Sequence, residues 1–367
     1  MKMEKHGFLR NIKMDHVILE DYAKEIKASC SNVILYGAGC WAKQQYRMLQ
    51  ELGVNVNAVG IDAAYYQPGI KFFDKEIRPI EELVKNIPNP VLWVGFNLDK
   101  KSYGVLRREL VARFGVEKIY ACDCAKYENF AMQNYKYNDV VAHADDFQWL
   151  YDRLNEGKSK ETFLSYLNQR VSGDYGWAEE LYDPNHYFAK DLVKLENEIF
   201  VDCGAFTGDT IQELLAKSEP QKVFAFEPDE KNYQTLVKNF IHDDSIVCLK
   251  MGAFNKKATL SFAGGNADAS KIVDDGTIQI EVDSIDNILN GEKATFIKMD
   301  IEGAELDALK GAQNTIRNYH PKLAISAYHK FEDLFTLPQY IYSLDNSYKF
   351  YLRRHSHLTH ELVLYAL

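Results

Sequence analysis

Residues 199–210, with the sequence IFVDCGAFTGDT, constrain the fold of this chain more than any other stretch. A short apolar run ends at Asp202, and Gly204 and Gly208 follow before a helical pattern begins. A second apolar run, Val223–Phe226, ends in another acid, Glu227. Strands that lead through glycine turns into helices are typical of a parallel α/β sheet, which binds ligands at the carboxyl ends of its strands. We therefore predict a nucleotide-type site at this edge.

The spacing of the glycines favours S-adenosylmethionine over a dinucleotide as the cofactor. Asp-x-Gly-x-x-x-Gly differs from the G-x-G-x-x-G of dinucleotide sites, and an acid in the turn repels a pyrophosphate but tolerates the methionine ammonium. Glu227 can accept both ribose hydroxyls, whereas Asp209 has capping of the helix dipole as its alternative role. The predicted cofactor-binding residues are Asp202, Gly204, Phe206, Thr207, Gly208, Asp209 and Glu227.

Length and composition point to an ordinary globular protein of two domains. The chain has 367 residues, of which 46% are hydrophobic and 26% charged, and its formal net charge is −10. This charge, with no basic block to offset it, argues against a nucleic-acid partner. No signal peptide or membrane span is evident in the sequence, so we expect a cytoplasmic protein and leave homo-oligomerisation open.

The six cysteines are scattered along the chain, and we expect them to be reduced thiols. Cys122 and Cys124 form a tight pair without a second pair at zinc-finger spacing, which disfavours a structural metal there. Cys203 lies in the glycine turn, and we interpret it as a packing residue.

Residues 1–124 are predicted to form a Rossmann-like domain. Strands are expected at 32–36, 54–61, 91–96 and 116–121. Gly37, Gly39 and Ala42 follow the first strand, and Asp62 follows the second, as in a dinucleotide fingerprint. Two interpretations stay open: a nucleotide site, or a scaffold used for packing or dimerisation.

Residues 125–195 are predicted to form a helical connector or cap. Ser159 is the expected N-cap of one helix, and Gly173 its stop. Tyr187 lies closest in sequence to the glycine turn, and we predict that it contacts the substrate.

Residues 196–367 alternate again between strands and helices. Strands are expected at 199–202, 223–227, 246–250, 258–262, 278–282, 294–299, 323–328, 348–353 and 361–366. The last two should form an antiparallel hairpin, because only a short polar turn around His357–His360 separates them. We expect His355, His357 and His360 to be solvated residues of this turn, with a metal site as the less favoured alternative. The fold class predicted for the whole chain is α/β, with two Rossmann-like domains.

Several motifs in this region together resemble the FkbM family of S-adenosylmethionine-dependent methyltransferases, over about residues 185–367. The motifs lie at 200–210, 224–228, 296–305, 309–312, 328–330 with Asp333, and 348–352. The resemblance implies a class I methyltransferase sheet, mostly parallel with a reversed last strand. It also implies O-methylation, often of a sugar or polyketide hydroxyl, and thus a small-molecule or glycan acceptor.

The predicted catalytic residues are His329, Asp300 and Glu302, which follow apolar strands and should face the ligand edge. Transfer to an alcohol requires that a proton be removed, and an unperturbed histidine titrates near neutrality. We nominate His329 as general base, with Asp300 or Glu302 as orienter or alternate base. Glu305 could equally cap the next helix. Two acids at one edge also admit a divalent metal with oxygen ligands, which is the less favoured alternative.

The loop from Gly264 to Lys271 is predicted to contact the acceptor through Asn266, Ser270 and Lys271, because small polar residues suit a hydroxylated ligand. Its alternative is an ordinary solvated loop. Two further hypotheses for the whole chain are a nucleotide-sugar or NAD-dependent enzyme run by the N-terminal domain, and a non-catalytic scaffold that binds the cofactor.

Overall fold

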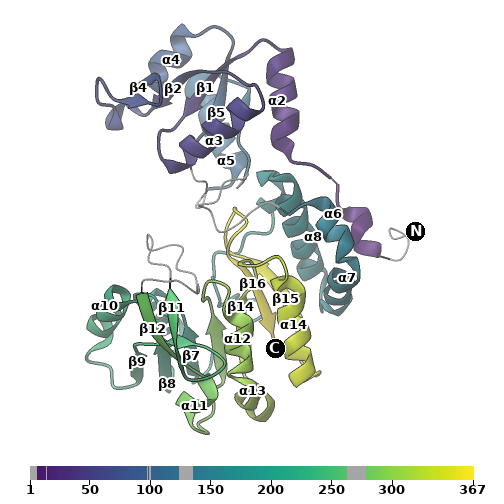
Figure 1. Cartoon of the computed structure of the whole chain (residues 1–367), viewed down its shortest axis with the longest axis vertical. Coiled ribbons are helices and arrows are strands. Elements are labelled where there is room, and N and C mark those ends of the chain that lie inside the picture. Colours follow the sequence, from purple (N-terminus) through teal and green to yellow (C-terminus); the bar gives the residue numbers. More distant parts are fainter. Residues whose placement is uncertain (1–5, 14, 97, 99–100, 124–134, 263–277) are drawn as a thin grey trace. The chain divides into compact units, whose positions relative to one another are not determined.

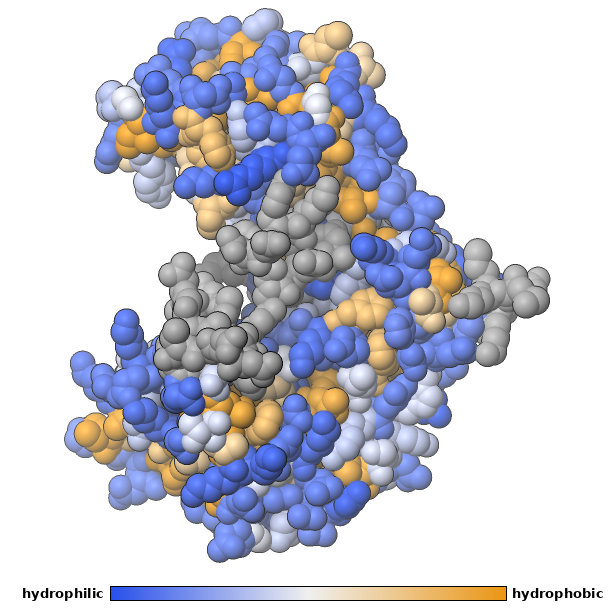
Figure 2. Space-filling view, viewed as in Figure 1, coloured by the Kyte–Doolittle hydropathy of each residue, from blue (hydrophilic) through white to orange (hydrophobic). Residues whose placement is uncertain are grey.

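The computed structural model describes residues 6–13, 15–96, 98, 101–123, 135–262 and 278–367. The chain divides into two compact units (Figure 1). Unit 1 comprises Met1–Ala144, Leu164–Tyr182 and Ser356–Thr359, and unit 2 comprises Asp145–Phe163, Asp183–His355 and His360–Leu367. In the described ranges, no helix has the length and apolar character that a membrane span needs. On the face drawn in Figure 2, hydrophilic residues predominate and hydrophobic ones form small separate patches.

Unit 1 contains a six-stranded sheet in the order β3-β4-β2-β1-β5-β6. Its strands are β1 (Asn32–Tyr36), β2 (Val56–Ile61), β3 (Lys71–Phe72), β4 (Lys75–Pro79), β5 (Pro90–Val94) and β6 (Ile119–Tyr120). Its helices include α2 (Ile18–Ala28), α3 (Cys40–Glu51), α4 (Ile80–Asn86), α5 (Tyr103–Phe114) and α6 (Tyr137–Ala142). All pairings are parallel except β3 with β4, and that hairpin was not predicted. The predicted Rossmann-like architecture is confirmed.

Strands β1 and β5 are buried along almost their whole length, because helices cover both faces of this parallel sheet. The β-branched and leucine side chains of Val33, Ile34 and Leu35 are fully buried on its alternate faces. This is why the run reads as continuously apolar in the sequence rather than as an alternating pattern.

Helix α8 (Gly157–Ser172) corrects one sequence-based prediction. It starts two residues before Ser159, which therefore is not its N-cap. The Ser159 hydroxyl instead accepts hydrogen bonds from the Leu352 backbone N–H and from Arg353 Nη1, both at 3.1 Å. Gly173 follows the last helical residue with φ +71°, so the predicted glycine stop is confirmed. The preceding helix is α7 (Ala144–Arg153).

Unit 2 contains a seven-stranded sheet in the order β15-β16-β14-β13-β7-β8-β9. Its strands are β7 (Ile199–Cys203), β8 (Lys222–Phe226), β9 (Ile246–Leu249), β13 (Phe296–Met299), β14 (Lys322–Ser326), β15 (Phe350–Arg354) and β16 (Leu362–Ala366). Strand β16 is antiparallel to both of its neighbours, and the pairings from β14 to β9 are parallel. The predicted sheet with a reversed last strand and a terminal hairpin is confirmed.

Helices and a small second sheet complete unit 2 (Figure 1). The helices are α9 (Asp209–Lys217), α10 (Glu230–Phe240), α11 (Ile285–Leu289), α12 (Glu305–Lys310), α13 (Gln313–Tyr319) and α14 (Asp333–Leu344). The small sheet joins β10 (Gly252–Ala253), β12 (Ile278–Asp283) and β11 (Ala258–Phe262). Strands β11 and β12 pair in antiparallel orientation.

The strand order places a topological switch point between β7 and β13. From β7 the chain builds outward through β8 and β9, and the later strands β13 and β14 build the other way. Ligands of open α/β sheets bind outside the carboxyl ends of the strands at such a point. The reversed strand β16 begins at this same edge, because Val363 pairs with Ser326 at the end of β14. The edge therefore has a half over β7 and β8 and a half over β13, β14 and β16.

Candidate active site

Two positions in the glycine turn after β7 leave no room for a side chain. Gly204 and Gly208 have φ values of +84° and +90°. A Cβ at Gly204 would lie 2.0 Å from the Asp300 carbonyl oxygen, and one at Gly208 would lie 2.2 Å from the Phe240 ring. The turn therefore packs directly against the end of β13, and its backbone lies at the ligand edge as predicted.

Glu227 follows β8 and faces the turn. Its Oε2 accepts a hydrogen bond from the Phe206 N–H at 2.8 Å, and its Oε1 accepts one from the Asp229 N–H at 2.9 Å. Burial raises the pKa of this carboxyl to about 7. Each oxygen retains a second lone pair. A ligand with two adjacent hydroxyls can thus complete the hydrogen bonding of a carboxylate that is already held in place.

Asp202 lies under the turn rather than in front of it. Its side chain is completely buried, and its Oδ1 is 3.0 Å from Lys298 Nζ. The same ammonium donates a hydrogen bond to the Gly204 carbonyl at 2.8 Å. Burial alone would lower the pKa of Lys298, but Asp202 and Asp300 outweigh this effect and raise it. Asp202 thus supports the turn through Lys298, and its contact with a cofactor stays a prediction.

The other predicted cofactor residues surround the start of α9. Phe206 is exposed and has φ +48°, an unusual conformation for a residue with a side chain. The Thr207 carbonyl accepts a hydrogen bond from Asn239 Nδ2 at 2.9 Å. Asp209 is exposed in the first turn of α9. Its carboxylate therefore interacts favourably with the helix dipole, which is the alternative role considered for it.

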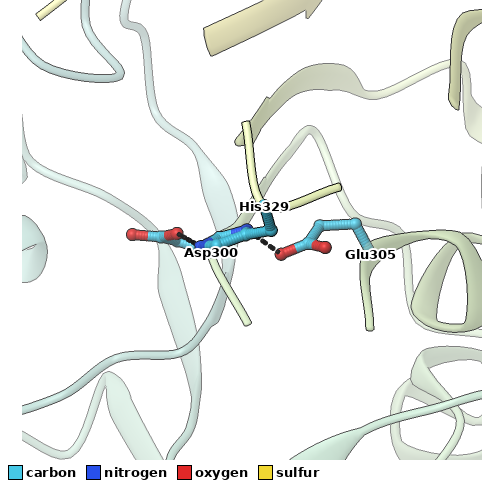
Figure 3. Close-up of side chains that lie close together, drawn as sticks. All are labelled: Asp300, Glu305 and His329. Carbon is cyan, nitrogen blue, oxygen red and sulfur yellow. Dashed lines mark ion pairs between the residues drawn. The ribbon is translucent and has the colours of Figure 1, made fainter. Parts of the chain in front are cut away.

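His329 lies between carboxylates in the second half of the edge (Figure 3). Its Nδ1 is 3.0 Å from Glu305 Oε1, and its Nε2 is 3.5 Å from Asp300 Oδ1 and 3.8 Å from Glu302 Oε2. The imidazole is only 6% exposed. Burial by itself would lower the pKa of His329, but Glu305, Asp300 and Glu302 outweigh it and raise the pKa to about 10. The three predicted catalytic residues are thus neighbours, and the histidine is the most enclosed of them.

Two tyrosines hold Asp300 in position. Tyr187 donates a hydrogen bond to Asp300 Oδ2 at 2.8 Å, and Tyr328 donates one to Oδ1 at 3.2 Å. Both tyrosines are buried, and burial raises the pKa of each well above its ordinary value, so both remain donors. Tyr187, predicted to contact substrate, therefore has its hydroxyl on Asp300.

Glu305 stabilises the backbone turn that carries Glu302. Its Oε1 also accepts hydrogen bonds from the N–H groups of Ile301 and Gly303, at 2.9 and 3.3 Å. Glu302 and Gly303 have φ values of +55° and +94°. Strained conformations of this kind cost of order 1–3 kcal/mol and persist where the surroundings over-determine them. The turn leaves the Glu302 carboxylate 41% exposed, with its Oε2 3.8 Å from His329 Nε2.

Three further residues of this edge, Glu361, His186 and Lys298, were not predicted from the sequence. Glu361 precedes β16, and its Oε2 is 2.7 Å from Nε2 of His186, whose ring stacks on Tyr187. The reversal of the last strand could have indicated Glu361, because it brings the start of β16 to the ligand edge. Lys298 could have been noticed as a lone lysine inside the apolar strand β13.

Some other predictions are corrected or lie outside the described residues. His355 and His357 are buried rather than solvated. His355 contacts the Asp183 carbonyl at 2.8 Å and the Tyr365 hydroxyl at 2.9 Å, and burial lowers its pKa to about 3. Five described cysteines, Cys203 among them, are free thiols as expected. The predicted acceptor-loop residues Asn266, Ser270 and Lys271, and also Cys124, lie outside the described residues.

The glycine turn of unit 1 is also present where predicted. Gly37 follows β1 with φ +125°, and a Cβ there would lie 2.9 Å from the Gly95 carbonyl oxygen. Asp62 accepts a hydrogen bond from the Tyr36 hydroxyl at 2.8 Å and forms a 2.7 Å ion pair with Arg113. Its carboxylate is therefore engaged by side chains of its own unit.

Comparisons with known proteins find methyltransferases that are similar to this chain. Residues 202–353 match the family model of the methyltransferase FkbM domain. The crystal structure of methyltransferase FkbM from Methylobacillus flagellatus is similar to 95% of this chain and 93% of its own, with a TM-score of 0.73 and 25% identity. Hexuronic acid methyltransferase AglP of Haloferax volcanii is 28% identical over 142 residues, which are 35% of this chain. The match spans 58% of the length of that relative.

Proposed function

We propose that the chain is a member of the FkbM methyltransferases, whose domain model residues 202–353 match, and that it transfers the methyl group of S-adenosylmethionine to an oxygen of a hydroxylated carbohydrate. One observation carries the proposal. The switch point divides the ligand edge into a half with the glycine turn and Glu227, and a half with Asp300 and Glu302. The first half suits a nucleoside cofactor, and the second half suits a hydroxylated acceptor.

The hydrogen-bonding groups of the first half suit S-adenosylmethionine. The backbone at Gly204 approaches its neighbours so closely that a Cβ has no room. Glu227 would accept the ribose hydroxyls, and the start of α9 would face the methionine carboxylate. When bound, S-adenosylmethionine supplies an electrophilic methyl group on a positively charged sulfur.

The second half would align the acceptor and receive its proton. As the acceptor oxygen forms its bond to the methyl carbon, the carbon–sulfur bond breaks with its electrons on sulfur, and the hydroxyl proton must leave. We assign that proton to the Asp300–Glu302 pair, because Glu302 is the more exposed carboxylate. His329 is enclosed with both ring nitrogens toward carboxylates, so we assign it to positioning this pair rather than to the base role.

A carbohydrate acceptor is supported by the curated relative, whose name states that it methylates hexuronic acid. Sugars present several neutral hydroxyls, which can donate hydrogen bonds to carboxylates such as Asp300 and Glu302. We propose the hydroxyls as the methylated positions.

The test combines binding and transfer on the full chain. Calorimetric titration with S-adenosylhomocysteine should show one site per chain in the wild type. Radiolabelled S-adenosylmethionine should then transfer its methyl group to glucuronic acid or methyl glucoside as probes. Asp300→Asn and Glu302→Gln should reduce transfer and leave S-adenosylhomocysteine affinity within about twofold. A wild type that binds no S-adenosylhomocysteine would overturn the proposal. Transfer unaffected by both variants would overturn the roles assigned to Asp300 and Glu302.

A further inference from the structure

The half of the edge over β13 and β14 concentrates negative charge in a largely enclosed place. Asp300, Glu302, Glu305 and Asp333 all lie within reach of His329, and Glu305 and Asp333 are buried. Among the described residues Lys298 and Lys330 are also near, but Lys298 already pairs with Asp202, so His329 and Lys330 are left to offset four carboxylates. Buried carboxylates are costly unless a cation or several donors compensate them. The cluster therefore has more negative charge than its own side chains neutralise.

The imidazole of His329 presents one nitrogen to this charge without a hydrogen bond. Its Nε2 is buried and makes no hydrogen bond, although it faces Asp300 and Glu302. The separations of 3.5 and 3.8 Å are longer than a hydrogen bond between such groups. Two ligand atoms that share one ion at about 2.1 Å lie roughly 3.0–3.5 Å apart in octahedral or tetrahedral geometry. The 3.5 Å separation matches that of two ligands of one cation, and the 3.8 Å separation is longer, so Glu302 must move to reach the same ion.

The other face of the ring has the partner that metal-binding histidines usually have. Glu305 Oε1 lies 3.0 Å from Nδ1, and the backbone N–H groups of Ile301 and Gly303 fix that carboxylate. A carboxylate on the second ring nitrogen sets the tautomer and the orientation of a ligating imidazole. One possible ligand atom from each of Asp300, Glu305 and His329 lies within 4.8 Å of the others (Figure 3). This arrangement leaves Nε2 directed toward Asp300 and Glu302.

We propose that Asp300, Glu302 and His329 Nε2 bind a divalent cation, with Glu305 holding the imidazole in place from its other side. The exposed Glu302 carboxylate would complete the site by a small side-chain rotation. One imidazole with two carboxylates suits a first-row ion such as Mn²⁺ or Zn²⁺, and the exposed side leaves room for water or an acceptor oxygen. The inference rests on the proposed function and deepens it, because a hydroxyl bound to such an ion becomes a stronger acid.

The experiment measures Mn²⁺ binding to the full chain after treatment with EDTA and desalting. Titration followed by the electron paramagnetic resonance signal of free Mn²⁺ should show one bound ion per chain. Pulsed measurements should show coupling to a nitrogen nucleus, which His329→Gln should abolish. Asp300→Asn and Glu302→Gln should each weaken binding by at least about tenfold. Glu332→Gln is the matched control, because it removes the same charge from an exposed residue near His329 and should change nothing.

Titration with S-adenosylhomocysteine on the same samples separates this inference from the proposed function. A wild type that binds S-adenosylhomocysteine but neither Mn²⁺ nor Zn²⁺ overturns the cation site and leaves the methyltransferase proposal standing. A wild type that binds Mn²⁺ but no S-adenosylhomocysteine overturns the methyltransferase proposal and leaves the cation site standing. Mn²⁺ binding that is equal in wild type, His329→Gln and Glu302→Gln also overturns the cation site, and Glu302→Gln serves if His329→Gln fails to fold.

Discussion

The two glycine turns of this chain share a backbone frame and differ in the side chains around it. In unit 1 the N–H of Gly95 donates to the Tyr36 carbonyl at the end of β1, and in unit 2 the N–H of Asp300 donates to the Cys203 carbonyl at the end of β7. Gly95 directly follows β5, the neighbour of β1, and Asp300 directly follows β13, the neighbour of β7, so the two residues hold equivalent positions. Unit 1 thus has a glycine, Gly95, at the position where unit 2 has the carboxylate of Asp300. The frame alone is therefore insufficient for the chemistry.

The acids at the ends of the second strands differ in the same sense. Asp62 is bound by Tyr36 and Arg113, whereas the oxygens of Glu227 accept backbone N–H groups of the turn and the adjoining loop. A ligand at Asp62 would have to displace a side chain, and a ligand at Glu227 would not. The comparison teaches that the partners of the acid, rather than the glycine pattern, distinguish a ligand site from a scaffold.

The largest effect is expected at the turns themselves. Gly204→Ala places a Cβ against a backbone oxygen at 2.0 Å and should destabilise unit 2 by about 4 kcal/mol or more. Gly37→Ala meets its oxygen at 2.9 Å and should cost about 2 kcal/mol. Gly53→Ala, at φ +69° in open space, isolates the backbone strain at about 1 kcal/mol. Urea denaturation measures all three, and equal losses at Gly204 and Gly53 would contradict the close packing.

The next effect concerns one ion pair in each unit, Lys298 with Asp202 in unit 2 and Arg113 with Asp62 in unit 1. Lys298→Met leaves the buried Asp202 carboxylate without its cation and should cost about 3–5 kcal/mol. Arg113→Met removes a partner from the partly exposed Asp62 and should cost at most about 1 kcal/mol. The free energy of unfolding from urea titration compares the two variants. Similar losses would show that Arg113 is as deeply embedded in its unit as Lys298 is.

The third effect is a dependence of stability on pH, which we expect in unit 2 because burial raises the pKa of Glu227. The pKa of Glu227 rises from an ordinary 4.5 to about 7 on folding, so the folded chain holds an extra proton between these values. This contribution is fully present below pH 4.5 and is lost as pH rises through 7, by of order 3 kcal/mol. Urea denaturation at several pH values should show a smaller change in Glu227→Gln. An unchanged profile in that variant would refute the assignment.

Most of the fold could be predicted from the sequence, because strand burial and turn chemistry are local signals. Strands such as β7, which are apolar throughout, are buried on both faces, and their ends coincide with acids or glycines. The β3–β4 hairpin was missed, since β3 has only two residues, one of them exposed. Ser159 was misplaced because its hydroxyl bonds a distant strand, a tertiary contact that no capping rule contains.

The residues of the candidate site could be predicted where they stand at the ends of apolar strands. Contacts between residues that are distant in sequence could not be predicted. The neighbourhood of Asp300, Glu302 and His329 followed from strand ends, which meet at one edge of a parallel sheet. The enclosure of His329 could not be predicted, because it depends on Glu305 reaching back from α12. Burial of Asp202 was likewise hidden, since its partner Lys298 lies on a strand far away in sequence.

The last prediction tests the two acids as ligand groups and has the smallest expected effect. Glu227→Gln should weaken S-adenosylhomocysteine binding by about 10- to 100-fold, because a neutral amide replaces a charged acceptor of ribose hydroxyls. Asp62→Asn, the matched change in unit 1, should leave that affinity within about twofold. Calorimetric titration at pH 8 measures both variants, with Gly53→Ala as a fold control. If Asp62→Asn weakened binding as much as Glu227→Gln, the contrast between a ligand-accepting acid and an internally engaged one would fail.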